Sequence, residues 1–236
     1  MKDAFHAFVV HGKTVAVNPA QAGTKAAAHY RLEVEAGQSV TVRLCLTDAP
    51  PRVASPFAAF EKTVEARRRE ADEFYRSCTP ESASEDTALV MRQAFAGLFW
   101  TKQYYFFDVN LWLREHGVNP FDSAASVPVR NRHWFHMRND DIISMPDKWE
   151  YPWYAAWDLA FHAVAIARVD PDLAKHQLNL MLKPRFLHSN GQLPAYEWNF
   201  GDVNPPVHAW ATLFQYRVEQ AQRGEGDLEF LKRAFN

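Results

Sequence analysis

The sequence predicts a mainly helical protein that begins with a short β segment. Apolar and polar residues alternate in parts of the first 50 residues, which is the pattern of strands. A Pro-rich stretch at residues 48–56 forms the clearest boundary, and apolar residues recur at helical spacing in most of the chain after it. With 236 residues, of which 47% are hydrophobic, the chain has enough apolar material for a sizeable core.

The first 50 residues contain two alternating runs, at 30–35 and 40–47. They flank the turn signal Ala36-Gly37-Gln38 and predict a hairpin with one buried face. Because two strands are not stable alone in water, we expect residues 1–50 to form the closing edge of a larger β-sandwich or to pack on the helices after the linker. We expect residues 51–83 to be a linker and a linker helix.

After the linker the sequence predicts only helices and loops. Apolar spacing predicts helices over residues 57–77 and 84–107. Residues 118–151 have no clear period, and a loop of that length in a compact domain is usually functional or disordered. This loop holds too many aromatic residues for disorder, which favours a functional loop.

Cap and proline signals predict two consecutive helices, at about 152–168 and 172–186. Each has a proline at or near its start, and Asp170 suits the cap of the second helix. Because only about three residues join these helices, we expect an antiparallel hairpin. The loops 118–151 and 187–204 should then meet at the same end of this hairpin, which we call the mouth.

Two further helices are predicted near the end of the chain. Asn204-Pro205-Pro206 again places a cap residue before prolines, and the helix after them runs to about Gln222. The letters GEGD begin another helix, within which the sequence stops at Asn236. We therefore expect the chain to be a piece of a longer protein.

Composition and motifs argue against several classes of function. Lys plus Arg number 26 and Asp plus Glu 28, so the chain lacks the basic surface that nucleic acids and anionic membranes require. No stretch approaches the roughly 20 apolar residues of a membrane span. Cys45 and Cys78 have no metal-like spacing, and His133 and His136 form an H-x-x-H pair without a third ligand. We expect no metal and no cofactor, no nucleic-acid or membrane partner, and a cytoplasmic location.

The mouth gathers aromatic rings and polar side chains that suit a sugar. Rings stack on the apolar faces of a pyranose, and glycosidic cleavage needs two carboxyl groups, one of them protonated. Asp158 is the best candidate for that acid. To work near pH 7 its pKa must rise from ~3.9 to ~6 or above, and burial beside Trp157 is the kind of desolvation that supplies such a rise. The candidate substrate-binding residues are Trp149, Tyr151, Trp153, Trp157, Gln192, Tyr196, Glu197, Trp198, Asn204 and His208.

Ordinary structural roles remain open for these residues. Three of the Trp residues are spaced by four, and on a continuous helix they would form a stripe, which is more often core than sugar platform. An isolated Asp158 would be a solvated or ion-paired helix residue. Glu197 and Asp202 can satisfy backbone N–H groups of their loop, and His162 can be a core histidine.

Two long segments resemble one enzyme family. Residues 145–162, MPDKWEYPWYAAWDLAFH, resemble the first catalytic motif of glycoside hydrolase family 63. Residues 190–210, NGQLPAYEWNFGDVNPPVHAW, match the same branch, the bacterial members similar to mannosylglycerate hydrolase and mannosyl-oligosaccharide glucosidase. The resemblance covers about residues 86–235.

The resemblance implies an (α/α)6 barrel, of which residues 84–236 would be the truncated N-terminal half. It implies an inverting O-glycosidase, α-glucosidase-like, that acts on α-linked glucosides or related oligosaccharides with Asp158 as general acid. The general base would be a Glu that no position here matches, so we expect this piece alone to be inactive and the rest of the barrel to be its partner. Glu197 would contact or orient substrate, although spacing alone also allows it as base. The rival hypotheses are a non-catalytic carbohydrate-binding or scaffold module and an ordinary helical interaction domain.

Overall fold

The computed structural model describes residues 3–48, 56–119, 121–122, 134–145, 147, 153–196 and 199–235. The chain divides into two compact units, one up to Glu65 and one from Ala66 onward. Among the described helices, none has the length and apolar character needed to cross a membrane.

The first unit begins with helix α1, Asp3–His11, so the prediction of β structure from the first residue is wrong. An acidic residue in its first turn and a histidine in its last suit the helix dipole. Gly12 comes next with a φ of +63°, and the N–H of Lys13 donates to the carbonyl of Ala7 at 3.1 Å. A glycine in the left-handed region directly after the last helical residue ends many helices. A short 3-10 helix, Thr14–Ala16, lies directly after it.

The turn predicted at Ala36-Gly37-Gln38 is present, but the strands on either side of it are not. The N–H of Gln38 donates to the carbonyl of Glu35 at 3.0 Å, and Gly37 has a φ of +74°. Residues 3–48 contain no strand, and the apolar residues of both runs are exposed. The predicted hairpin is therefore wrong for this structure, because two runs without further strands cannot bury a face. The β-sandwich edge stays a prediction.

The second unit begins within helix α2, Phe60–Cys78, and continues with helix α3, Glu85–Trp100, which correspond to the first two predicted helices. The N–H of Thr87 donates to Oγ of Ser84 at 3.2 Å, which caps α3. An ion pair of 2.6 Å between Asp72 and Arg92 joins the two helices. The predicted end of the second helix near residue 107 is wrong, because α3 ends at Trp100.

A two-stranded antiparallel sheet comes after α3, so the prediction that everything after the linker is helical is wrong. Strand β1, Lys102–Asp108, pairs with strand β2, Arg138–Ser144, and the first residue of β1 lies opposite the last of β2. The segment YYFF within β1 is aromatic, which favours a strand once a partner covers it. Helix α4, Val109–Glu115, begins after Asp108, whose side chain accepts from the N–H of Leu111 at 2.9 Å.

The predicted helical hairpin is present. Helix α5, Ala156–Ile166, and helix α6, Pro171–Met181, pack together and are joined by four residues. Asp170 caps α6, since its Oδ1 accepts from the N–H of Leu173 at 2.9 Å, and Pro171 occupies the first turn as predicted. Both helices are shorter than predicted.

The last two predicted helices are also present, as α7, Val207–Arg223, and α8, Leu228–Phe235. The predicted cap of α7 is wrong, because Pro206 occupies that position. Asn204 instead donates from Nδ2 to the carbonyl of Leu193 at 3.0 Å, within the loop before the helix.

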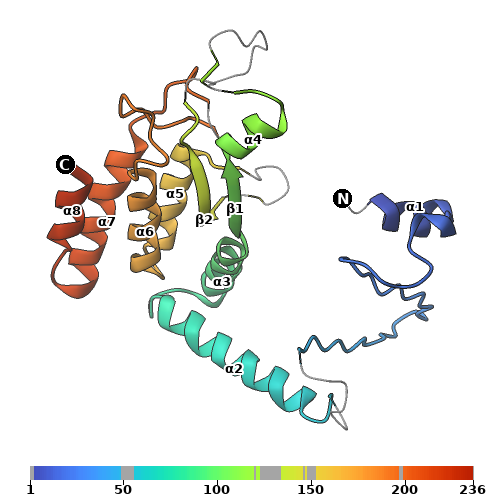
Figure 1. Ribbon diagram of the computed structural model, residues 1–236. Helices are drawn as coiled ribbons and strands as arrows, with labels where there is room; N and C mark the ends of the chain where they lie inside the picture. Colours follow the sequence, from blue (N-terminus) through green and yellow to red (C-terminus); the bar gives the residue numbers. More distant parts are fainter. Residues whose placement is uncertain are drawn as a thin grey trace. The chain divides into compact units, whose positions relative to one another are not determined.

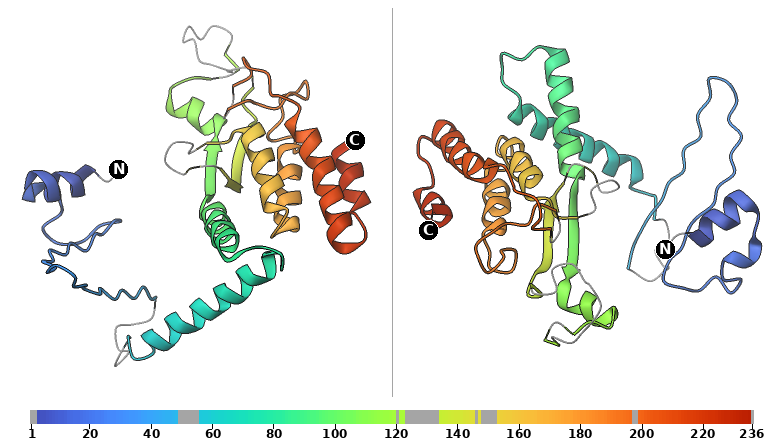
Figure 2. Two further views of the ribbon diagram at one scale, coloured as in Figure 1. Left: turned by 180° about the vertical axis from the view of Figure 1, so that it is seen from behind. Right: turned by 90° about the horizontal axis from the view of Figure 1, so that it is seen from above.

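Helix α5 lies at the centre of the second unit, where β2, α6 and α7 pack against it. Figures 1 and 2 show β2 between β1 and these helices, and α8 beyond α7. The small side chains on α5 allow its neighbours to approach closely. Its buried residues are Ala156, Leu159, Ala160, Ala163 and Ile166.

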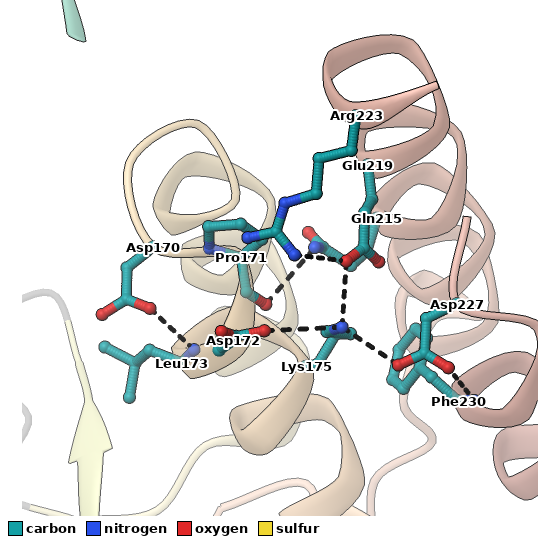
Figure 3. A network of polar contacts seen from close by, with 10 residues as sticks. All are labelled: Asp170, Pro171, Asp172, Leu173, Lys175, Gln215, Glu219, Arg223, Asp227 and Phe230. Carbon is teal, nitrogen blue, oxygen red and sulfur yellow. Dashed lines mark hydrogen bonds and ion pairs between the residues drawn. The ribbon is translucent and has the colours of Figure 1, made fainter. Parts of the chain in front are cut away.

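A network of charges joins α6, α7 and the start of α8 (Figure 3). Nζ of Lys175 lies 3.1 Å from Glu219 and 3.0 Å from Asp227, and Arg223 lies 2.9 Å from Glu219. The Glu219 side chain is only 5% exposed, so these cations offset the cost of its burial. Burial lowers the pKa of Lys175, but hydrogen bonds to Asp227 and Glu219 outweigh burial and raise the pKa overall.

We predict that Lys175→Met lowers the free energy of unfolding by ~3 kcal/mol, because it leaves a buried carboxylate with one cation fewer. Urea denaturation monitored by circular dichroism would measure the change. The matched control is Lys232→Met, which breaks an exposed 2.8 Å pair with Glu229 and should cost under ~0.5 kcal/mol. Equal losses in the two variants would contradict the prediction.

Candidate functional site

The two loops predicted to meet at one mouth do meet where the structure describes them. Nε1 of Trp134, from the first loop, lies 3.2 Å from the carbonyl oxygen of Leu187 in the second loop. The ring of Trp134 also meets that of Phe200 edge to face, with centroids 4.3 Å apart. Trp134 is buried, so these contacts pack the two loops against each other.

Backbone contacts reinforce this convergence. The N–H of Arg138 donates to the carbonyl of Arg185 at 3.3 Å, and Ala155, just before α5, forms a β-bridge with Tyr196. The first turn of α5 is therefore tied to the second loop. The convergence predicted from the short connection between α5 and α6 is confirmed for these residues.

Asp158 lies in the first turn of α5 and is partly buried. Burial raises the pKa of its carboxyl above the ordinary 3.8, although its own backbone N–H acts in the opposite direction. Desolvation therefore outweighs the backbone hydrogen bond. No ion pair to Asp158 is present in the described part of the chain. The direction of the pKa shift is the one that a general acid needs.

The Trp stripe predicted along a continuous helix is not formed in the described residues. Helix α5 begins at Ala156, so Trp153 precedes it and only Trp157 lies on it. Trp153 packs against the core, and Trp157 is partly exposed. Trp149, Tyr151, Glu197 and Trp198 lie outside the described residues.

Three of the predicted polar site residues bond to backbone carbonyls around the second loop. Nε2 of Gln192 donates to Phe200 at 3.3 Å, and Asn204 donates to Leu193. Nε2 of His208 lies 3.0 Å from the carbonyl of Leu178, and burial lowers its pKa, so it donates as a neutral ring. These side chains therefore organise the loop and the start of α7. Tyr196 is 39% exposed.

An aromatic row that the sequence did not reveal runs across α5 and α7. Ring centroids are 6.2 Å apart between Trp157 and Phe161, and 6.0 Å between Phe161 and Trp210. Phe214 continues the row 5.5 Å further along α7. Phe161 and Trp210 are nearly half exposed and, with Pro206 and Val207, line an apolar hollow of about 310 Å³. Only the register between α5 and α7 brings these rings together.

A second feature missed in the sequence lies behind Asp158. His162, one turn later on α5, has Nδ1 3.0 Å from Oγ of Ser144 at the end of β2. Ser144 Oγ is also 3.4 Å from Oγ1 of Thr101, directly after α3. The sequence allowed His162 as a core histidine. Its ring is half-buried and makes this polar contact, and burial lowers its pKa.

Residues 151–236 match the domain family described as the mannosylglycerate hydrolase MGH1-like glycoside hydrolase domain. The match confirms the predicted resemblance for this part of the chain and defines it as a glycoside hydrolase-like domain. It includes α5, α6, α7 and α8, together with the second loop.

The chain is also 44% identical to a protein of Saccharomyces cerevisiae described as "Uncharacterized protein YMR196W". The alignment covers 99% of this chain but 22% of the yeast protein, so the chain spans about a fifth of that relative's length. No solved structure matches the chain.

The raised pKa of Asp158 makes a prediction about stability. Ionisation of a desolvated carboxyl disfavours the folded state, so its cost is absent below the unfolded pKa of 3.8 and complete above the raised folded pKa. We therefore predict that Asp158→Asn raises Tm by about 1–2 °C near neutral pH but not near pH 3.5. Thermal melts at both pH values would measure this difference.

The matched control is Asp172→Asn, in the first turn of α6. Its carboxylate is 76% exposed and lies 3.5 Å from Lys175. An exposed carboxylate at a helix N-terminus is favourable, so this substitution should not raise Tm at either pH. A stabilisation by Asp158→Asn that is the same at both pH values would contradict the prediction.

Proposed function

We propose that this chain is part of an inverting glycosidase, acting on α-linked glucosides or related oligosaccharides, with Asp158 as general acid. The observation that carries the proposal is the match of residues 151–236 to a glycoside hydrolase domain, with Asp158 inside the matched segment. The desolvated carboxyl supplies the chemistry, because its raised pKa favours the protonated form, which can give a proton to a leaving oxygen.

The arrangement around Asp158 supports a sugar site. The two loops contact each other through Trp134 and Leu187, the second loop is bridged to Ala155 just before α5, and Trp157, next to Asp158 in the sequence, is partly exposed. An aromatic face and a protonated carboxyl match the apolar face and the glycosidic oxygen of a pyranoside. We propose the same role in substrate contact for the other predicted residues of the site, Trp149, Tyr151, Trp153, Gln192, Tyr196, Glu197, Trp198, Asn204 and His208.

The packing of α5 and α7 supports an (α/α)6 barrel. His208 at the start of α7 meets Leu178 late in α6, so α7 runs against α6 and parallel to α5. Parallel inner helices that alternate with antiparallel outer ones are the layout of such a barrel. We propose that Phe161, Trp210 and Phe214 of the aromatic row are covered by the rest of the barrel, because a bare apolar face of this kind marks an interface.

The general base is then a carboxylate from the rest of the barrel. An inverting site needs it ~6.5–9.5 Å from the acid, which leaves room for the attacking water. Asp158 protonates the leaving oxygen while the base takes a proton from that water, and the anomeric configuration inverts.

A carbohydrate-binding module without catalysis is the second candidate. It is favoured by the bonding of Gln192, Asn204 and His208 to backbone groups, which leaves few described polar side chains to act on a substrate. In this case Asp158 would only hydrogen-bond a hydroxyl group.

We predict that Asp158→Asn in the full-length protein lowers kcat/KM for an α-linked disaccharide by about 10²–10⁴-fold, because the leaving oxygen is no longer protonated. The loss should be smaller with α-glucosyl fluoride, since fluoride leaves without a proton. Product release measured by chromatography gives both values.

Asp172→Asn again serves as the matched control, and it should keep wild-type turnover because its carboxylate is exposed and away from the loops. Wild-type turnover by Asp158→Asn would end the assignment. Absence of turnover in any length of wild-type protein, together with sugar binding, would favour the binding module.

Tryptophan fluorescence separates both sugar-binding candidates from an ordinary helical interaction domain. We predict a saturable change on titration with an α-linked oligosaccharide, reduced in Trp157→Phe because Trp157 adjoins Asp158 in the first turn of α5 and is partly exposed. Trp100→Phe is the control, since Trp100 is 79% exposed at the end of α3. A protein with no saturable change would be the interaction domain.

A further inference from the structure

A glycine turn ends α4 and folds the chain back beside the helix. Gly117 has a φ of +69°, and its N–H donates to the carbonyl of Arg114 at 3.0 Å. The N–H of Val118 donates to the carbonyl of Leu113 at 2.9 Å. These two bonds form the Schellman pattern, in which the residue after the glycine also packs on the last turn of the helix. Val118 and Leu113 are buried in the same small core, so this core holds the turn in place.

The residues after this turn are held by further contacts. Oδ1 of Asn119 accepts from the N–H of Phe121 at 3.0 Å, which is an Asx turn, and the carbonyl of Asn119 accepts from the N–H of Asp122 at 3.1 Å. The ring of Phe121 meets that of Phe135 edge to face, with centroids 4.8 Å apart. Phe121 is nevertheless 76% exposed. It therefore presents an open aromatic ring whose position is set by its neighbours.

A hollow of about 370 Å³, which we call the α4 hollow, lies between the helix and these turns. Its lining residues are Asn110, Arg114, Gly117, Val118, Asn119 and Phe121. The volume is within the range of pockets that bind small molecules. Asn110 and Arg114 are four residues apart, so they share one face of α4. Both side chains are exposed, and neither has a hydrogen-bond or ion-pair partner among the residues that the structure describes.

The lining suits a neutral ligand that has both an apolar face and hydroxyl groups. The open ring of Phe121 can stack on C–H groups, while the amide of Asn110 and the guanidinium of Arg114 supply hydrogen-bond donors. An anion is disfavoured, because residues 110–122 contain two acidic residues, Glu115 and Asp122, against one arginine. A pyranose has the required combination of an apolar face and hydroxyl groups.

The α4 hollow and the mouth share one small core. Trp134, which joins the two loops, lies in the same core as Val118, and Phe200 of the second loop packs against it. Phe135, directly after Trp134, carries the ring that contacts Phe121. Figure 1 shows α4 and the loop between α6 and α7 at the same end of the sheet. The α4 hollow is therefore on the side of the domain where the loops meet.

We propose that the α4 hollow binds a sugar unit of an oligosaccharide substrate, remote from the bond that is cleaved. Phe121 stacks on this sugar, and Asn110 and Arg114 donate hydrogen bonds to its hydroxyl groups. The proposal rests on the proposed function, because its ligand is the oligosaccharide on which Asp158 acts. No bond forms or breaks in the hollow, which only adds affinity for longer substrates.

The dependence on substrate length tests this role in the full-length protein. We compare kcat/KM for an α-linked tetrasaccharide with that for the disaccharide, using product release measured by chromatography. Phe121→Ala should lower this ratio about tenfold, because only the longer substrate reaches the hollow. Arg114→Met, which keeps the aliphatic stem but removes the donors, should lower it as well. Phe121→Tyr, which keeps the ring, should retain the wild-type ratio.

Two matched controls change residues outside the hollow. Trp100→Ala removes a ring that is 79% exposed at the end of α3. Glu115→Gln changes the charge directly next to Arg114, on a residue of α4 that does not line the hollow. Both variants should keep the wild-type ratio.

Equilibrium binding gives a readout that does not depend on the identity of the acid. A sulfur-linked α-tetrasaccharide resists hydrolysis, so its Kd can be measured by isothermal titration calorimetry on active protein. We expect Phe121→Ala to raise this Kd about tenfold and Trp100→Ala to leave it unchanged.

The outcomes separate the two proposals. An unchanged Kd in Phe121→Ala, or equal losses of kcat/KM for both substrates, would overturn the role of the α4 hollow whatever Asp158 does. Wild-type turnover by Asp158→Asn would overturn the proposed function, while a raised Kd in Phe121→Ala would still support sugar binding in the hollow.

Discussion

The structure of the second unit depends on the burial of one helix, α5, on several sides at once. Its small buried side chains let α6 and α7 approach closely, while β2 covers another side through Ser144 and His162. A helix held in this way cannot rotate without opening several contacts. The first turn of α5, and with it Asp158, is therefore fixed at the edge of the core, where desolvation is partial and the carboxyl still reaches solvent.

Local signals in the sequence were enough to predict the helical part of this arrangement. The Asp170 cap and Pro171 fix the start of α6, and the short link before them requires an antiparallel hairpin. Convergence of the two loops results from that geometry without any knowledge of side-chain contacts. The position of Asp158 near the start of a helix was predictable for the same reason, although the helix predicted from residue 152 placed it in the second turn and α5, which begins at Ala156, places it in the first.

Features that depend on distant pairing were not predictable. The segment of β1 fits both a helical and a strand pattern, and its partner β2 lies about 30 residues further along the chain. Because the spacing of apolar residues does not reveal that partner, it predicted that the helix of α3 continues through this segment. The runs on either side of Gly37 have strand alternation but no further strand to cover them in residues 3–48. The hydrogen bond between Ser144 and His162 and the ring contact between Phe161 and Trp210 both require the register of neighbouring elements, which no local pattern contains.

The candidate site thus depends both on local signals in the sequence and on contacts between elements that lie far apart in the chain. Partial burial raises the pKa of Asp158, and that burial results from the position of the first turn of α5 at the edge of the core. One turn further along α5, Nδ1 of His162 lies 3.0 Å from Oγ of Ser144, which in turn lies 3.4 Å from Oγ1 of Thr101. Gln177 of α6 bonds to the N–H of Ser144 and to the carbonyl of Ile142, so the end of β2 is tied to the helix whose short connection to α5 brings the loops together. The packing of α5 against β2 and α6 therefore fixes the turn that carries Asp158 as well as the end of the hairpin at which the loops meet.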